Sequence, residues 1–421
     1  MNPLFSKYLE RHTPFTKFDS KSIKESDLVV VIPVFLEKDI CKTLDSLKKC
    51  NPIPKHVAVV LVVNAGVNAA EDIIVTQEQT IVELDAYSTA FNNEHLSFYT
   101  VKAFDLPRKH FGAGLARKIG MDLAIQHFFD HSNDNGIIVS LDADTMVEEN
   151  YFTEIYHWFN RSHKRKACSI YYEHPIEGDE FDEEIYQAVT QYELYLRYYV
   201  SALKVIGFPY AYHTVGSCFA VHANAYVKVG GMNRRQGGEE FYFIQKLVQM
   251  GGYGELNSTI VKPSSRISER VPFGTGPSIK NIVTDEEDYS TYNPTSFFDL
   301  KVLFDSVEEY YAISEEEYQS KILELPGRVR SFLLNSSFWE EINNLSENCS
   351  NVEAFKKRFY HVFNAFKLVK YLNYTHEHFI GKIPVFDAAI ELLEYMQYNT
   401  DDFFEERELL LKFREIQKGE N

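Results

Sequence analysis

The stretch Gly136–Phe152 reads GIIVSLDADTMVEENYF, an apolar run that leads directly into two aspartates separated by one alanine. A short apolar run of this kind is typical of a buried β-strand. Successive side chains of an extended chain point to opposite faces, so Asp142 and Asp144 project to the same side and can share one cation. Open α/β sheets bind their ligands at the carboxyl ends of their strands. The pair therefore predicts a metal and phosphate site, although a single aspartate at this place would more often cap the next helix.

Length and composition set limits on the kind of protein. A chain of 421 residues has room for a catalytic domain and one appended unit, because a single core stops growing at about 250–300 residues. Hydrophobic residues make up 45% and aromatic residues 14%, as in a well-packed globular protein. The net charge of −18 argues against nucleic-acid binding, which depends on neutralising phosphates. We therefore expect no nucleic-acid partner, and only a local basic patch at any phosphate site.

The cysteines and the N-terminal segment bear on the compartment. The 5 cysteines show no metal-ligand spacing, and their odd number favours free thiols in a reducing environment. The opening sequence MNPLFSKYLERHTPF lacks the apolar segment of a secretion signal, and no run approaches the roughly 18 apolar residues of a membrane span. These features predict a cytoplasmic protein.

Short β-rich runs alternate with longer helical patterns between Asp27 and Glu173, which is typical of βαβ units around a mostly parallel sheet. The strands predicted in this part are 28–34, 56–63, 96–101, 136–142 and 167–173, with helices over 38–49, 69–91, 112–130 and 149–162. The pattern then predicts a helix over 182–205, a strand over 217–222, a helix over 239–250 and a strand over 253–262. We therefore predict an α/β fold.

The last part of the chain has a helical pattern, with helices predicted over 315–334, 350–372 and 385–417. We predict an N-terminal extension over 1–26, an α/β domain over 27–285 and an α-helical C-terminal region over 286–421. Within 350–372 an apolar stripe is surrounded by basic residues; the stripe is Phe355, Phe359, Val362, Phe366 and Val369. Such a helix either packs its apolar face on the core or lies on an anionic membrane, so peripheral contact with the inner face of a membrane stays an alternative.

Several motifs, taken in order over roughly residues 27–275, resemble those of the inverting family 2 glycosyltransferases of the GT-A fold. They are VVVIPVFLE, VVNAG, GAGLARKIGMD, SLDADTMVEENYF and VGSCFAVHANAYVKVGGMNRRQGGEEFYF. The resemblance implies a GT-A type nucleotide-binding fold with a mostly parallel central sheet, and makes 27–285 the catalytic domain. It also implies transfer of one sugar from a nucleoside diphosphate sugar, most commonly a UDP-sugar, to an acceptor hydroxyl.

The resemblance further implies roles for individual residues near the donor. Asp142 would contact the nucleoside and Asp144 would bind Mn²⁺ or Mg²⁺, with Asp142 as a second metal ligand; the cation neutralises charge that builds on the departing diphosphate. The implied nucleotide-binding residues are Pro33, Phe35, Glu37, Asn64, Arg117 and Asp142. The implied residues of the acceptor and donor pocket are Gly216, Ser217, Arg266 and Arg270. Asn64 stands where many relatives carry aspartate, which leaves the identity of the nucleotide base open.

The acceptor hydroxyl must lose its proton as it attacks, so the reaction needs a general base. The segment GGEEFYF resembles the Glu-Asp pair that begins a helix in the family, which implies Glu240 as the base and Glu239 as the second choice. A glutamate in place of aspartate lengthens the arm by one methylene. Alternatively, both glutamates simply complement the dipole of the helix. His222 is either a further metal ligand or a structural residue.

Other functions remain open at this point. LDADTM also approaches the signature of haloacid dehalogenase-like phosphatases, but Met146 stands where that family has threonine. A non-catalytic nucleotide-sugar-binding protein and a nucleotidyl transferase are further alternatives. The chain lacks the Gln-x-x-Arg-Trp motif of processive synthases, which favours transfer of one sugar. The acceptor would be a saccharide or a lipid-linked intermediate, as in surface polysaccharide or glycoconjugate synthesis.

Overall fold

A computed structural model describes residues 2–12, 14–234, 237–268, 274–284 and 289–419 of the chain. Its contacts divide the chain into two compact units. The first comprises Met1–Tyr186 and Thr214–Asn281, and the second comprises Gln187–His213 and Ile282–Asn421. The division is therefore not a single cut in the sequence, because residues 187–213 group with the C-terminal helices.

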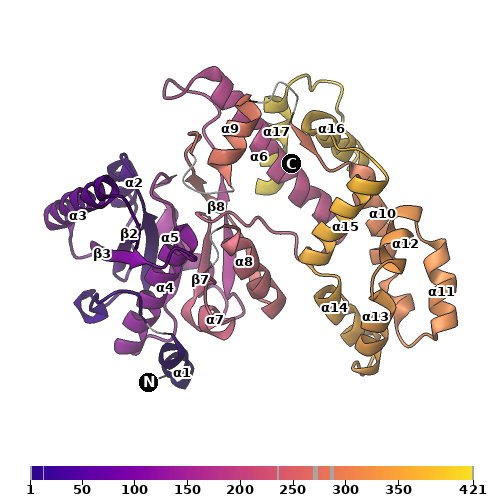
Figure 1. The fold of residues 1–421 in the computed structure, drawn as a ribbon, viewed down its shortest axis with the longest axis horizontal. Helices are drawn as coiled ribbons and strands as arrows, with labels where there is room; N and C mark the ends of the chain where they lie inside the picture. Colours follow the sequence, from indigo (N-terminus) through magenta and orange to yellow (C-terminus); the bar gives the residue numbers. More distant parts are fainter. Residues whose placement is uncertain (1, 13, 235–236, 269–273, 285–288, 420–421) are drawn as a thin grey trace. The chain divides into compact units, whose positions relative to one another are not determined.

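An eight-stranded sheet forms the centre of the first unit, in the order β3-β2-β1-β4-β7-β6-β8-β5 (Figure 1). Its strands are β1 (Leu28–Val34), β2 (Val57–Gly66), β3 (Leu96–Leu106), β4 (Ile137–Ser140), β5 (Met146–Val147), β6 (Ala167–Tyr172), β7 (Phe219–His222) and β8 (Tyr253–Lys262). Strand β1 is parallel to β2 and β4, β2 to β3, and β6 to β8, whereas β7 is antiparallel to β4 and β6. The prediction of an α/β fold with a mostly parallel sheet and a helical C-terminal region is confirmed.

Helices pack on this sheet and on one another. Those that lie wholly in the first unit are α1 (Pro3–Arg11), α2 (Ile40–Lys48), α3 (Glu71–Phe91), α4 (Ala113–Asp130), α5 (Tyr151–Asn160), α7 (Ala223–Lys228) and α8 (Glu239–Met250), while α9 (Thr275–Thr284) crosses the division. The segment predicted as an N-terminal extension packs closely: α1 contacts α4 and α7. Tyr8 of α1 and Tyr226 of α7 both donate to Asp122 Oδ1 of α4, each at 2.7 Å. A half-buried carboxylate thus fixes the first helix to the rest of the first unit.

The second unit is helical apart from a two-stranded sheet of β9 (Ser290–Thr291) and β10 (Ile383–Pro384). Its helices are α6 (Glu183–Val205), whose first turn belongs to the first unit, α10 (Pro294–Asp305), α11 (Glu315–Glu324), α12 (Gly327–Leu334), α13 (Phe338–Glu347), α14 (Val352–Val362), α15 (Ala365–His378), α16 (Val385–Tyr395) and α17 (Glu406–Lys418). The three continuous helices predicted over 315–334, 350–372 and 385–417 are therefore wrong, because each is divided into two helices. Pro326 separates α11 from α12, since proline cannot continue a helix. Asn364 caps α15 by accepting from the amides of Phe366 and Lys367, and residues 396–405 separate α16 from α17.

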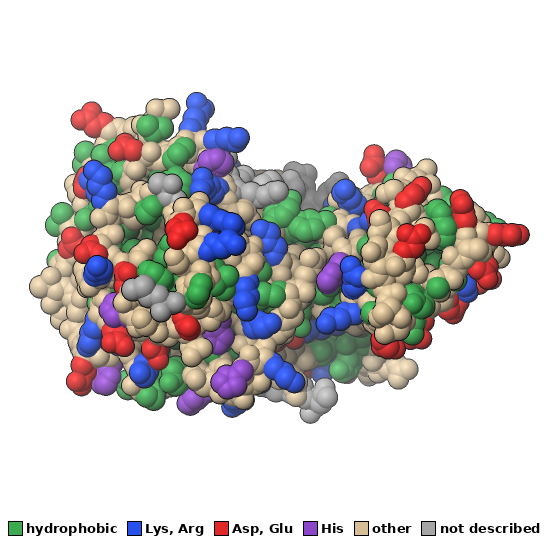
Figure 2. All heavy atoms as spheres, turned by 90° about the horizontal axis from the view of Figure 1, so that it is seen from below, with side chains coloured by type: hydrophobic (Ala, Val, Ile, Leu, Met, Phe, Trp, Pro, Cys, Tyr) green, Lys and Arg blue, Asp and Glu red, His purple; other side chains and the backbone are tan. Residues whose placement is uncertain are grey.

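The apolar stripe considered for membrane contact is partly in the interior of the second unit, because Val362, Phe366 and Val369 are only half-buried. Phe355 and Phe359 are fully buried, and Phe359 packs edge-on against Phe338 with ring centroids 6.1 Å apart. Figure 2 shows acidic side chains crowding the end of this unit that carries α11, whose first turn is Glu315, Glu316 and Glu317. An acidic surface repels anionic lipids. Among the helices described, none has the length and hydropathy to span a membrane. Peripheral membrane contact stays a prediction without support from these residues.

Close packing between α4 and the sheet depends on a glycine, and we expect its substitution to be costly. A Cβ atom at Gly120 would lie 2.4 Å from Val31 Cγ1 and 3.0 Å from Val62 Cγ2. Gly120→Ala should therefore lower the free energy of unfolding by about 1–3 kcal/mol through overpacking, measured by urea denaturation. Gly381→Ala is the control, because its Cβ would meet nothing within 4 Å. Equal stabilities of the two variants would contradict this account of the packing.

Candidate active site

The acidic motif follows β4 at its carboxyl end, as the sequence predicts. The chain turns at once, because the amide of Thr145 donates to the carbonyl of Asp142 at 3.3 Å. Thr43 of α2 holds the middle of the turn by donating from Oγ1 to the carbonyl of Ala143 at 2.9 Å. Asp142 and Asp144 flank this anchored peptide, so their carboxylates have a defined backbone origin.

Arg117 of α4 joins this motif to the start of α8. Its Nη2 donates to Asp142 Oδ1 at 2.7 Å, and its Nη1 donates to Glu239 Oε1 at 2.5 Å. Only 4% of the Arg117 side chain is exposed. Burial opposes its charge, but Asp142 and Glu239 keep the pKa of Arg117 above its ordinary value. The guanidinium also needs Gly216, where a Cβ atom would lie 2.9 Å from Nη2.

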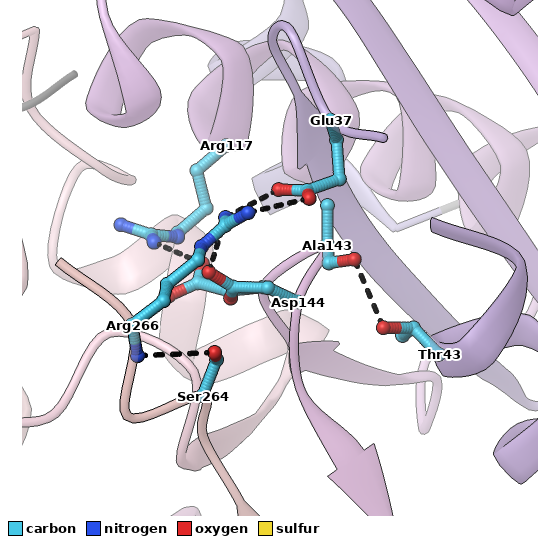
Figure 3. A network of polar contacts seen from close by, with 8 residues as sticks. Glu37, Thr43, Arg117, Ala143, Asp144, Ser264 and Arg266 are labelled. Atoms are coloured by element: carbon cyan, nitrogen blue, oxygen red, sulfur yellow. Dashed lines mark hydrogen bonds and ion pairs between the residues drawn. The ribbon is translucent and has the colours of Figure 1, made fainter. Parts of the chain in front are cut away.

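Arg266, beyond the end of β8, holds a second group of carboxylates (Figure 3). Its Nη1 and Nη2 donate to Glu37 Oε1 and Oε2 at 2.7 and 2.5 Å, a bidentate pair. Nη2 also donates to Asp144 Oδ2 at 2.5 Å. Burial raises the pKa of Asp144 to about 6; Arg266 opposes that rise, and the nearby charges of Asp142 and Glu37 add to it. The carboxylates predicted to bind metal and nucleotide are thus each paired with an arginine.

Glu240 lies in the first turn of α8, immediately after the residue that Arg117 binds. The turn begins at Gly238, whose φ of 66° is a left-handed conformation that favours glycine. Burial and the charge of Glu239 raise the pKa of Glu240, an effect that Arg117 partly offsets. Unlike Glu239, Glu240 forms no ion pair with any residue described. A half-buried carboxylate with a raised pKa and no ion-pair partner among the described residues has the properties of a general base.

The remaining predicted nucleotide contacts lie near the carboxyl ends of β1 and β2. Pro33 is in β1, and Phe35 follows that strand with its ring edge-on to Phe111 at 5.2 Å. Asn64 is buried in β2 and donates from Nδ2 to the carbonyl of Val34 at 2.9 Å. Its Oδ1 is buried and has no hydrogen-bond partner among the described residues. Their contact with a nucleotide remains a prediction.

The structure describes most, but not all, of the residues predicted to form the acceptor and donor pocket. Gly216 lies against Arg117, and its carbonyl accepts from Ser140 Oγ at 2.7 Å. Ser217 is buried beside Cys218, with Oγ and Sγ 3.3 Å apart. Arg270 lies outside the described residues.

His222 lies at the opposite end of β4 from the acidic motif. It pairs with Ile137, the first residue of β4, and its ring packs edge-on against Phe159 at 4.5 Å. Nδ1 is buried without a hydrogen-bond partner in the described chain. This position favours the structural interpretation, because the acidic motif follows the other end of the strand.

The side chains at the site offer oxygen ligands for a divalent cation, but they are too few to fill its coordination shell. Among the described residues, no group of three or more His, Cys, Asp or Glu side chains could hold a metal ion. Asp142 and Asp144 nevertheless offer hard carboxylate oxygens from neighbouring positions. Mg²⁺ is usually held by one or two carboxylates together with substrate phosphates and water. The residues present fit an ion that binds together with a diphosphate.

The fold is an α/β fold, and the candidate site lies at the carboxyl end of β4, where open α/β sheets bind their ligands. Residues 137–284 match the family model described as glycosyl transferase family group 2. The matched segment contains the acidic motif, the Glu239 and Glu240 pair and Arg266. The match confirms the predicted resemblance to family 2 glycosyltransferases and the prediction that this chain is a glycosyltransferase.

The chain is also similar to solved structures of S. aureus TarS. TarS residues 1–349 have 11% identity and a TM-score of 0.38, with 80% of this chain and 92% of that chain covered. The complex of the same TarS segment with UDP-GlcNAc has 11% identity and a TM-score of 0.39, and the complex with UDP has 12% and 0.38, with the same coverage. A likeness at this level says nothing about the substrates of this chain. No curated protein sequence matches the chain.

Some residues that support the site carry no signal in the sequence. Thr43 anchors the acidic turn, and Ser140 anchors Gly216. Gln77, fully buried in α3, donates to the carbonyl of Asn64 at 2.8 Å and accepts from the amide of Leu36 at 3.0 Å. A polar residue inside a helical pattern normally predicts an exposed position, so only the tertiary contacts reveal this role.

Removing the positive charge that joins Asp142 to Glu239 should be strongly destabilising. Arg117→Met would leave Glu239 buried without a cation, so we expect the free energy of unfolding to fall by about 3 kcal/mol, measured by denaturant titration. Lys42→Met removes the same charge from a pair with Glu180 in which both side chains are more than half exposed, and should change stability little. Equal effects of the two substitutions would show that the buried ion pair has no special role.

The raised pKa of Glu240 predicts a pH-dependent gain in stability when its charge is removed. The fold disfavours the ionised form, so Glu240→Gln should stabilise the protein at about pH 8. The gain should shrink as the pH falls toward about 4, where wild-type Glu240 is protonated in both the folded and unfolded states. Thermal unfolding across this range tests the prediction. Glu239→Gln is the matched control and should destabilise the protein, because it removes the charged partner of Arg117. A stabilising Glu239→Gln, or a Glu240→Gln effect independent of pH, would contradict it.

Proposed function

We propose that this chain is a metal-dependent inverting glycosyltransferase that moves one sugar from a nucleoside diphosphate sugar, a UDP-sugar in the first instance, to an acceptor hydroxyl. The observation that carries the proposal is the position of Arg117, which binds Asp142 of the acidic motif and Glu239 next to Glu240. One buried side chain thereby couples the residues proposed for the leaving group to those proposed for the attacking group.

At the donor, Asp144 and Asp142 would hold Mn²⁺ or Mg²⁺, which supplies positive charge to the departing diphosphate when bound. Asp142 is fixed by Arg117, so its carboxylate is oriented before any ligand arrives. Pro33, Phe35 and Asn64 would contact the nucleoside from the ends of β1 and β2. Preorganised charge of this kind costs no rearrangement at the moment of reaction.

At the acceptor, Glu240 would take the proton of the attacking hydroxyl. Its raised pKa makes it a stronger base than an ordinary glutamate, and it has no described cation to neutralise it. Gly216 and Ser217 would border the acceptor and donor pocket. The acceptor would be a saccharide or a lipid-linked intermediate of surface polysaccharide or glycoconjugate synthesis, as the resemblance implies.

A screen of nucleotide sugars tests the proposal. Release of the nucleoside diphosphate should require Mn²⁺ or Mg²⁺, and should cease when EDTA removes the cation. The anomeric configuration of the product, measured by NMR, should be the opposite of that in the donor. No turnover or binding of any nucleotide sugar would refute the proposal. Release of inorganic phosphate from phosphomonoesters instead would favour the phosphatase alternative.

Substitution of the proposed base should reduce catalysis without loss of donor binding. We expect Glu240→Gln to lower kcat by about 10²–10⁴-fold, the usual contribution of a general base, with unchanged affinity for UDP by calorimetry. Glu94→Gln, at a glutamate whose side chain is 82% exposed, should leave kcat unaltered. Near wild-type transfer by Glu240→Gln would remove Glu240 from this role, and Glu239→Gln would then be tested in the same way.

A further inference from the structure

Arg266 binds the same carboxylate that we propose as the metal ligand. Its Nη2 lies 2.5 Å from Asp144 Oδ2, while both terminal nitrogens bind Glu37. The Glu37 side chain is 1% exposed, so the other side of this contact is sealed from water. Figure 3 shows the guanidinium between the two carboxylates. A positive group already stands at the oxygen where a cation would bind.

The backbone around Arg266 is held in place, which makes this contact a specific one. The amide of Arg266 donates to Ser264 Oγ at 3.3 Å, and Ser265 Oγ donates to the carbonyl of Pro175 at 2.7 Å. Asp144 is fixed from its own side, because Thr43 anchors the preceding peptide. The carboxylate and the guanidinium therefore face each other from two separately anchored segments.

We propose that Arg266 is an internal counter-ion of Asp144, which competes with the divalent cation for this carboxylate until a donor binds; the proposal rests on the function above. Two cations cannot both lie close to one carboxylate oxygen without strong repulsion. Cation binding at Asp144 thus requires the guanidinium to withdraw. Arg266 thereby couples the cation to the donor, because a diphosphate is the anion that can receive the displaced guanidinium.

One atom of Arg266 supports this second role. Nε is buried and has no hydrogen-bond partner among the residues described, although a guanidinium offers five donors that match phosphate oxygens. An unpaired buried donor costs free energy unless a ligand accepts from it. A diphosphate oxygen would satisfy this donor and would replace the negative charge that Asp144 gives up to the cation.

Mn²⁺ titration of the full-length protein without nucleotide, followed by electron paramagnetic resonance, tests the competition without any need for turnover. Arg266→Gln should bind Mn²⁺ about tenfold more tightly than wild type or better, because the competing charge is gone. Arg266→Lys keeps the charge but not the bidentate geometry, and should fall between them. Lys262→Gln is the matched control: it removes one positive charge from the same segment, where Lys262 pairs with Glu148 at 3.4 Å, and should leave Mn²⁺ affinity unchanged.

The added substitution Asp144→Asn shows whether the gain arises at this site. It should abolish the tighter binding of Arg266→Gln. Equal Mn²⁺ affinity of wild type and Arg266→Gln, an equal gain in Lys262→Gln, or a gain that survives Asp144→Asn would each overturn the proposal. Tighter binding that depends on Asp144, in a protein that turns over no nucleotide sugar, would sustain the counter-ion and refute the transferase function. Turnover of a nucleotide sugar, together with equal Mn²⁺ affinities of wild type and Arg266→Gln, would support the transferase function and refute the counter-ion.

Discussion

An excess of carboxylates over arginines is the constraint on which this site depends. Arg117 and Arg266 are the cations that the described structure places directly on them. The carboxylates are Glu37, Asp142, Asp144, Glu239 and Glu240. Ionised groups lose hydration when they are buried, and like charges add to that cost. Burial is the larger cause that raises the pKa of Asp144 to about 6 and the pKa of Glu240 above its ordinary value, and the neighbouring carboxylates add to both. A cation bound together with a diphosphate would neutralise the negative charge at Asp142 and Asp144. The charge on Glu240 would remain available to accept a proton.

The sheet brings these groups together only because the backbone permits close approach at two glycines. Gly120 lets α4 lie against β1 and β2, and α4 carries Arg117. Gly216, just before β7, leaves room for the guanidinium, while Ser140 of β4 holds its carbonyl. The antiparallel pairing of β4 with β7 therefore sets the position of Arg117 as well as that of the acidic motif. A shift of one residue in that pairing would turn every side chain of β7 to the other face of the sheet.

The sequence predicts the parts of the structure that depend on local pattern. Apolar runs locate β1, β2 and β4, and the acidic motif and the paired glutamates lie at element ends, where they are expected. Helix boundaries in the second unit are missed because a single residue, Pro326 or Asn364, interrupts an otherwise continuous periodicity.

The arginine partners of the site carboxylates are a different case. Arg117 meets Glu239 across 122 positions, and Arg266 meets Glu37 across 229, so no spacing in the sequence connects them. Arg117 is predicted to bind nucleotide; its terminal nitrogens bind Asp142 and Glu239, which gives it a positioning role, and its contact with a nucleotide stays a prediction.

The same contacts bear on the rival functions. A phosphatase that used Asp142 as its nucleophile would need that carboxylate free to attack phosphorus, but Asp142 is bound at 2.7 Å by a buried guanidinium that lowers its nucleophilicity. The motif also follows β4, the fourth strand along the chain, whereas that family carries it on the first strand. A protein that only binds nucleotide sugars would gain nothing from Glu240, whose raised pKa means that its ionised form costs stability at neutral pH. Perturbed groups of this kind cluster at functional sites, which favours the proposed role of Glu240 as the base over a role in binding alone.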